Sequence, residues 1–226
     1  MFRANVYSME PLTPVAREAI NDGIGMVAAY MGQTVASREL LVRLPLNERG
    51  NVNPARVGFN KLDKMVELHL MAVPLDPGAG ERIGLAGVGR GWSFVDTAKD
   101  SDQVIRTTTA HEVAHAFGFV SPSAEQTDPE SPFHCCDGNC IMHKMVTILV
   151  SEAEAEQQAP EESRRLLSKI PFRRKSKIVT PEPSPTYSVT DQYDFCLPCK
   201  IDLRDNSEAH MSELRTGRLF GTKGVR

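Results

Sequence analysis

The length, composition and charge of the chain exclude several classes of protein. Its 226 residues are 41% hydrophobic and 24% charged, with 16 glycines and 15 prolines, and this globular composition excludes collagen-like, coiled-coil and wholly disordered chains. The net charge of -3 gives no reason to expect nucleic acid or a membrane as a partner. The sequence has neither an apolar run of about 18 residues nor a signal-peptide pattern, so we expect a cytoplasmic protein.

The first predicted element is a helix over residues 11–31. Thr13 is the expected N-cap, Pro14 takes the first helical position, and Gly32 ends the helix. At roughly helical spacing the segment carries the apolar residues Val15, Ile20, Ile24, Val27, Ala28 and Met31. We therefore expect it to pack against a sheet as a backing helix.

Strands are predicted in the next three segments. The stretches Val35–Leu46 and Met65–Leu75 are rich in apolar and β-branched residues, which predicts two sheet strands. The segment Gly84–Ala98 contains four glycines before an aromatic and apolar end. It predicts a strand or an irregular rim that another group approaches closely.

A second helix is predicted over Asp102–Phe119, from an N-capping aspartate to a stop at Gly118. It carries His111 and His115 at positions i and i+4, on one helix face, so both imidazoles can reach a single metal ion. Glu112 lies beside them, where a carboxylate can take a proton from water that a metal has acidified. This spacing indicates a zinc hydrolase with Glu112 as general base, although a bare five-residue match also fits polar groups of an ordinary core.

The cysteines are confined to the C-terminal part of the chain. They are Cys135, Cys136, Cys140, Cys196 and Cys199. An odd, clustered set in a chain without an export signal favours metal binding over disulfides.

The segment after the second helix combines these signals. Gly118 lies three residues after His115 and lets the chain turn sharply out of the helix, as in the extended zinc signature of the metzincins. Those families have their third ligand three residues after the glycine, where this chain has Ser121. Residues 134–142 and a distant Cys-x-x-Cys pair instead resemble the archaemetzincin signature, which is His-Cys, four residues, Cys, one residue, Met, then Cys-x-x-Cys. The resemblance covers about residues 84–200.

The resemblance implies an α+β fold of the metzincin-like zincin type. Its parts would be a twisted mixed sheet, a backing helix, an active-site helix and a smaller C-terminal subdomain after the zinc helix. A single metallopeptidase domain, 1–226, would then comprise an N-terminal subdomain (1–118) and a C-terminal one (119–226). Residues 121–133 would be an insertion. So would residues 151–190, whose acidic, basic and proline-rich tracts we expect to be mobile.

The resemblance also implies two zinc ions per chain. The ligands of a catalytic zinc with an open fourth position would be His111, His115 and His134. The ligands of a closed structural zinc would be Cys135, Cys140, Cys196 and Cys199. Met142 would be the Met-turn residue, which packs beneath the catalytic zinc and does not bind it.

Other assignments stay open at the level of sequence. Asp128 and His143 are rival third ligands of the catalytic zinc. Cys136 is left over, and we expect a small packed or partly exposed thiol. His69 and His210 are expected to be core or surface histidines.

We expect the protein to be a zinc-dependent metallopeptidase acting on a peptide or protein substrate, as an endo- or an aminopeptidase. Leu85–Val95 resembles the metzincin upper-rim strand, which would pair with an extended substrate by adding a strand to the sheet edge. Tyr187 and Tyr193 are candidates for the group that stabilises the oxyanion, without motif support. The alternative is a zinc-stabilised interaction module that cuts no peptide, and an intact Glu112 argues against it.

Overall fold

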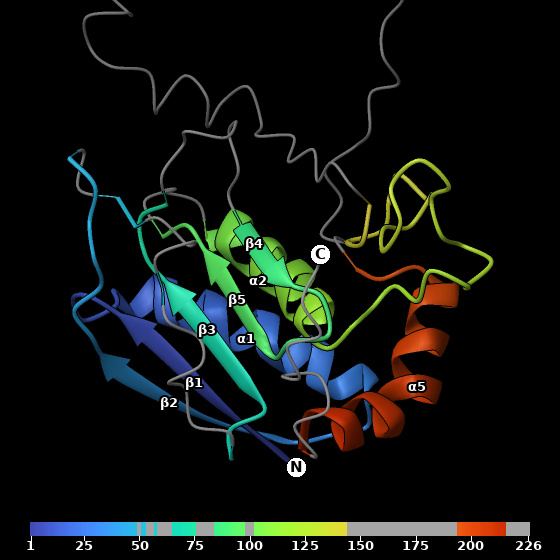
Figure 1. The fold of residues 1–226 in the computed structure, drawn as a ribbon, viewed down its shortest axis with the longest axis horizontal. Coiled ribbons are helices and arrows are strands. Elements are labelled where there is room, and N and C mark those ends of the chain that lie inside the picture. Colours follow the sequence, from blue (N-terminus) through green and yellow to red (C-terminus); the bar gives the residue numbers. More distant parts are fainter. Residues whose placement is uncertain are drawn as a thin grey trace, which may run out of the picture. The chain divides into compact units, whose positions relative to one another are not determined.

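A five-stranded mixed sheet carries the fold (Figure 1). The computed structural model describes residues 1–48, 51–52, 57, 65–75, 84–97, 102–143 and 194–215. The strands are β1 (Phe2–Ser8), β2 (Val35–Leu41), β3 (Leu68–Ala72), β4 (Gly84–Gly87) and β5 (Trp92–Val95). Their order is β2-β1-β3-β5-β4, with parallel pairing throughout except for β4, which runs antiparallel to β5. The predicted α+β class with a mixed sheet is confirmed.

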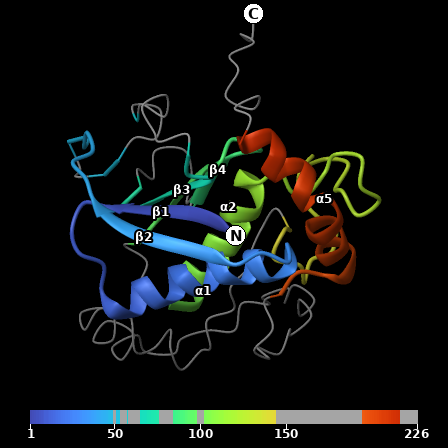
Figure 2. The ribbon, with the colours of Figure 1, turned by 90° about the horizontal axis from the view of Figure 1, so that it is seen from below.

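Three helices accompany this sheet in the described residues: α1 (Pro14–Tyr30), α2 (Asp102–Ala116) and α5 (Leu197–Arg215). Helices α1 and α2 share a core with one face of the sheet, to which β1 contributes Phe2, Ala4 and Val6 at period two (Figure 2). A second cluster, with Tyr7 and Phe94, lies on the opposite face. The backing helix and the helix with the histidines therefore pack on the same side.

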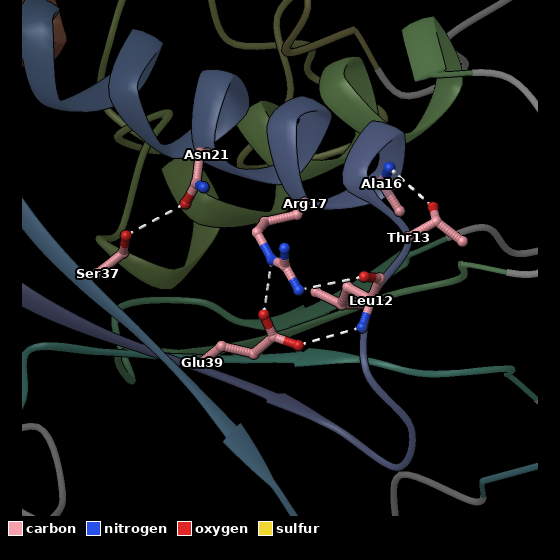
Figure 3. A network of polar contacts seen from close by, with 7 residues as sticks. All are labelled: Leu12, Thr13, Ala16, Arg17, Asn21, Ser37 and Glu39. Carbon is pink, nitrogen blue, oxygen red and sulfur yellow. Dashed lines mark hydrogen bonds and ion pairs between the residues drawn. The ribbon is translucent and has the colours of Figure 1, made fainter.

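The predicted start of α1 is confirmed at the atomic level. The Thr13 hydroxyl accepts a hydrogen bond from the Ala16 N–H at 3.2 Å, and Pro14 is the first helical residue (Figure 3). Gly32 follows the helix with φ +63°. Val15, predicted to face the core, is instead 57% exposed, because the second residue of the helix lies on the side that faces solvent.

Polar contacts fix α1 against the edge strand β2 (Figure 3). Arg17 donates from Nε to the Glu39 carboxylate at 2.8 Å, and the other carboxylate oxygen accepts from the Leu12 N–H at 3.1 Å. Ser37 donates to the Asn21 side chain at 3.2 Å. These groups are partly exposed, so each contributes modestly to stability and chiefly sets the position of α1 along β2.

Three strand predictions differ from the structure. β2 ends at Leu41, short of the predicted Leu46, because β1, with which it pairs among the described strands, ends at the paired residue Ser8. β3 spans Leu68–Ala72 within the predicted 65–75. Within the predicted segment 84–98, two strands form a hairpin, β4 and β5, because a turn with glycines at positive φ reverses the chain between them.

Two elements have no counterpart in the sequence predictions. β1 lies between β2 and β3 near the centre of the sheet, and α5 follows the Cys-x-x-Cys pair. The predicted mobile segment 151–190 lies outside the described residues, as do Tyr187 and Tyr193. In the described part of the chain, no helix combines the length and the apolar character needed to cross a membrane.

Candidate metal centres

The end of α2 is shaped by a glycine turn. Gly118 has φ +94°, a conformation in which a side chain would be strained. The Gly118 N–H donates to the His115 carbonyl at 2.8 Å, and the Phe119 N–H donates to the Ala114 carbonyl at 3.0 Å. These two bonds form a Schellman motif, which closes the helix and turns the chain back over its last turn.

Both helix histidines are oriented by backbone carbonyls. His115 donates from Nδ1 to the Phe119 carbonyl at 2.8 Å, which the glycine turn brings within reach. His111 donates from Nδ1 to the Ile141 carbonyl at 2.6 Å. A carbonyl oxygen only accepts, so each Nδ1 carries the proton and each Nε2 presents a lone pair.

His134 completes the cluster from the loop after the helix. Its Nδ1 lies 3.0 Å from the Ser131 hydroxyl, and its Nε2 lies 3.3 Å from Nε2 of His115. One ligand nitrogen each of His111, His115 and His134 lies within 4.8 Å of the others. The 13-residue segment 121–133 thus supplies the partner that orients the third imidazole.

The spacing of the imidazoles fits a metal ion. Two nitrogens bound to a tetrahedral zinc at about 2.0–2.1 Å lie about 3.3–3.4 Å apart, close to the separation of the Nε2 atoms of His115 and His134. A cation between these two nitrogens would bind one lone pair from each ring, with the ring proton of each on Nδ1. The donor set of three neutral imidazoles therefore fits zinc, with a fourth position for another ligand.

Burial keeps the imidazoles in the form that binds metal. It lowers the pKa of His111 to about 4, and it lowers the pKa of His115 well below the ordinary value of 6.5. The pKa of His134 is lowered for the same reason, although this ring is only half-buried. All three side chains are therefore neutral at pH 7.

Glu112 lies between the two helix histidines in the sequence and is 8% exposed. Strand β4 passes directly over it, since a Cβ atom built on Gly84 would lie 2.6 Å from both Cγ and Oε1 of Glu112. The carboxylate therefore lies beneath the edge of the sheet, on the helix that carries two of the three imidazoles.

The hairpin turn between β4 and β5 holds the end of the same helix. The Gly89 N–H donates to the His115 carbonyl at 2.8 Å, and the Gly91 N–H donates to the Ala116 carbonyl at 2.9 Å. These donors satisfy carbonyls that a helix end leaves open. The histidine turn of α2 is thus fixed to the strand that covers Glu112.

A second cluster joins four cysteines from two distant segments: Cys135, Cys140, Cys196 and Cys199. One sulfur of each lies within 4.8 Å of the others, and the sulfurs of Cys135 and Cys196 are 3.6 Å apart. A tetrahedral zinc with bonds of about 2.3 Å places its sulfurs about 3.8 Å apart, so this separation fits.

Backbone donors and thiols around Cys140 show how the cysteine cluster would ionise. The Cys199 thiol donates to the Cys140 sulfur and, with the N–H groups of Cys196 and Met142, lowers the pKa of Cys140 to about 6. Burial raises the pKa of Cys135 to about 12 and also raises that of Cys196. One thiolate is thus favoured and further ones are opposed, so four thiolates require a cation among them.

The structure also shows where the other residues named from the sequence lie. Neither Asp128 nor His143 joins the histidine group, and Cys136 is exposed and outside the cysteine group. Met142 is fully buried and accepts a hydrogen bond at its carbonyl from the Cys135 N–H. His69 is a buried histidine of β3, with Nδ1 2.9 Å from the Tyr7 hydroxyl.

Other residues of the region carried no sequence signal. His210 lies in α5, and its side chain is outside the described part of the structure. Ser131, Ile141 and Phe119 orient the imidazoles, although no motif marked them. A hydroxyl three residues before a ligand histidine is the one feature that could have pointed to Ser131.

Two solved structures that are similar to this chain are archaemetzincins. The crystal structure from Methanopyrus kandleri has 18% sequence identity and a TM-score of 0.48, with 65% of this chain and 82% of that chain covered. The one from Archaeoglobus fulgidus, complexed with malonate, has 14% identity and a TM-score of 0.44, with 63% and 85% covered. No family model matches the sequence, and no curated protein matches it.

Proposed function

We propose that the protein is a zinc-dependent metallopeptidase. The observation that carries the proposal is the histidine cluster, in which three buried or half-buried imidazoles bring one nitrogen each close together, two of them from the helix that also carries Glu112. A purely structural site has its four positions filled by protein ligands, as the cysteine cluster has. The histidine cluster has three, which is the number that catalytic sites use.

The chain's own residues divide the work of peptide hydrolysis. His111, His115 and His134 would hold the zinc, which when bound lowers the pKa of water and polarises a carbonyl. Glu112 would accept a proton from the attacking water and return it to the leaving amine. Its burial excludes bulk water, so a proton held on the carboxylate is passed on within the site.

The substrate class follows from the strand above the site. β4 is the last strand of the sheet, and within the described residues it pairs only with β5. An extended peptide can add to such an edge through backbone hydrogen bonds. We propose that β4 positions the peptide bond near Glu112 in this way, with a cysteine-bound second zinc holding the C-terminal segments in place.

The test compares the wild-type protein with Glu112→Gln on a peptide library read by mass spectrometry. We expect the wild type to cleave and the variant to lose about 100-fold to 10,000-fold in rate, because the amide cannot act as a base. Zinc content should stay at the wild-type value, since Glu112 is not a ligand. A wild-type protein that binds zinc and cleaves no peptide would favour the interaction module.

A further inference from the structure

Gly84 and Glu112 meet where the edge strand crosses the histidine helix. A Cβ atom on Gly84 would lie 2.6 Å from Cγ and Oε1 of Glu112, and 2.7 Å from Cγ2 of Thr108. Ordinary carbon contacts are about 3.5–4.0 Å, so no side chain fits at residue 84 while Glu112 keeps its position. The slot that the carboxylate occupies therefore exists because residue 84 is glycine.

The surroundings make this contact specific. Thr108 and Glu112 lie one turn apart on α2, and both are buried, at 3% and 8% exposure. Gly84 pairs with Val95 of β5, which fixes the height of the strand above the helix. The backbone on both sides is held by the sheet and the helix, so an added methyl group would displace side chains and leave the main chain in place.

We propose that Gly84 is a positioning residue for Glu112: its missing side chain lets the carboxylate stand under the β4 edge, within reach of a peptide paired to that strand. The inference rests on the proposed function for its catalytic consequence. The contact itself does not depend on it. A methyl group at residue 84 would rotate Glu112 away from this position, because rotation of a side chain is the least costly relief available.

The kinetic test uses Gly84→Ala in the zinc-loaded protein. We expect kcat to fall about 10-fold to 100-fold, because a displacement of about 1 Å at a catalytic group has effects of that size. KM and zinc content should change little, since neither the β4 backbone nor the imidazoles are altered. Gly25→Ala on α1 is the matched control, because a Cβ there meets nothing within 4 Å, and its kcat should equal that of the wild type.

The same substitution in a Glu112 variant tests whether Gly84 acts through Glu112. In Glu112→Ala neither Cγ nor a carboxylate remains to be displaced, so adding Gly84→Ala there should reduce the residual kcat by less than about threefold. A reduction of equal size in both backgrounds would overturn the proposal, because Gly84 would then act through the strand and not through Glu112.

A double-mutant cycle measured on Tm requires no enzyme activity. It therefore separates the proposed peptidase function from the proposed role of Gly84. Gly84→Ala should lower the Tm of the zinc-loaded protein by about 2–4 °C, and should lower it by a smaller amount in a Glu112→Ala background, where the contacts with Cγ and Oε1 are gone and only that with Cγ2 of Thr108 remains. If the loss of Tm is smaller in the Glu112→Ala background but the wild-type protein cleaves no peptide, the proposed peptidase function is rejected and the Gly84–Glu112 contact is retained. Equal losses of Tm in both backgrounds would reject the Gly84–Glu112 contact whatever the activity.

Discussion

Each imidazole of the histidine cluster is oriented through Nδ1 by a different segment. The partners are the carbonyl of Phe119 in the glycine turn, the carbonyl of Ile141 beside Met142, and the hydroxyl of Ser131 in the 121–133 segment. Such partners fix the tautomer and the direction of the ligand lone pair. Of the three, the Ser131 hydroxyl is the one that a substitution can remove without changing the backbone.

Ser131→Ala is therefore expected to weaken zinc binding at the histidine cluster by about 10-fold, because His134 loses one of the groups that hold its ring and keeps the backbone contacts with Ser131 and Pro132. Competition with a chromophoric chelator measures the affinity. Ser123→Ala is the control, since the Ser123 hydroxyl contacts Ser121 and no ligand. If both variants bound zinc as tightly as the wild type, Ser131 would not orient His134.

The burial of the histidines also makes stability depend on pH. Burial lowers the pKa of His111 to about 4 from 6.5, so the unfolded chain binds a proton there at a higher pH than the folded chain does. The part of the free energy of unfolding that depends on neutral His111 is fully present above about pH 6.5, and it is lost as the pH falls toward 4. Zinc also requires neutral imidazoles, so bound metal leaves the sign unchanged.

We expect the denaturant midpoint of the protein to decrease between pH 7 and pH 4.5, and to decrease less in His111→Gln, which lacks this titrating group. Unfolding curves at several pH values measure both slopes. The acidic residues affect both proteins alike, so the difference isolates His111. Parallel slopes would mean that His111 is not buried in its neutral form.

At the scale of elements, α5 ties the C-terminal segments to the rest of the fold. Cys196 immediately precedes α5, and Cys199 lies in its first turn. Both share the cysteine cluster with Cys135 and Cys140 of residues 117–143. Further along α5, the Asp202 carboxylate accepts a hydrogen bond from the N–H of residue 121 at 3.2 Å, just beyond the glycine turn. Helix α5 therefore helps to hold residues 117–143, which include His134, in position.

A second contact joins α5 to the backing helix. The Tyr30 hydroxyl at the end of α1 donates to the Asp194 carboxylate at 2.8 Å, and Lys200 of α5 forms an ion pair with the same carboxylate. Burial opposes ionisation of Asp194, but the bonds from Lys200 and Tyr30 outweigh it and lower the pKa of this carboxyl. The carboxylate thus stays charged at neutral pH and links α1 to the start of α5.

Cys196→Ser should lower the zinc content by about one ion per chain and lower Tm by about 10 °C or more, because structural zinc contributes directly to folding free energy. Cys136→Ser should change neither, since its exposed thiol lies outside the cluster. Elemental analysis and thermal melting measure the two quantities. Disulfides among these cysteines in the native protein, with one zinc bound, would contradict the second site.

At the scale of the molecule, two parts differ in what stabilises them. The sheet and helices α1 and α2 share a continuous apolar core, which also includes side chains of residues 117–143 such as Phe117, Phe119 and Ile141. The backbone of residues 117–143, in contrast, forms turns and isolated bridges without a helix or a strand, and both candidate metal clusters draw ligands from it. Segments of this kind have few ladder hydrogen bonds, so bound metal should supply much of their local stability.

Chelation should therefore affect the two parts unequally. We expect amide exchange to accelerate by about 10-fold or more in residues 117–143 and 194–215 after removal of zinc, with β1 and β3 nearly unchanged. Hydrogen exchange read by mass spectrometry measures this by segment, and zinc-reloaded protein is the control. Uniform acceleration over the chain would show that metal stabilises the sheet as well.

Features set by near neighbours in the chain were accessible from the sequence alone. The i, i+4 pair His111 and His115, the Thr13 cap and the stop at Gly118 each depend on a few consecutive residues, and all three are present. Local geometry fixes such features, because a helix turn or a cap has few alternatives. The four cysteines of the second cluster were instead assigned through the resemblance to the archaemetzincin signature, and the structure brings those four together without Cys136.

The tertiary structure decided what depends on partners far apart in the chain. β1 carries only a short alternation, Phe2, Ala4 and Val6, which the sequence analysis did not assign to a strand, and it is an inner strand because β2 and β3 pair with it. Tyr30 and Asp194 meet across 164 positions, and the Gly84 slot forms where a strand crosses a helix. Such contacts arise from the packing of whole elements, whose energy is spread over many residues that no short motif records.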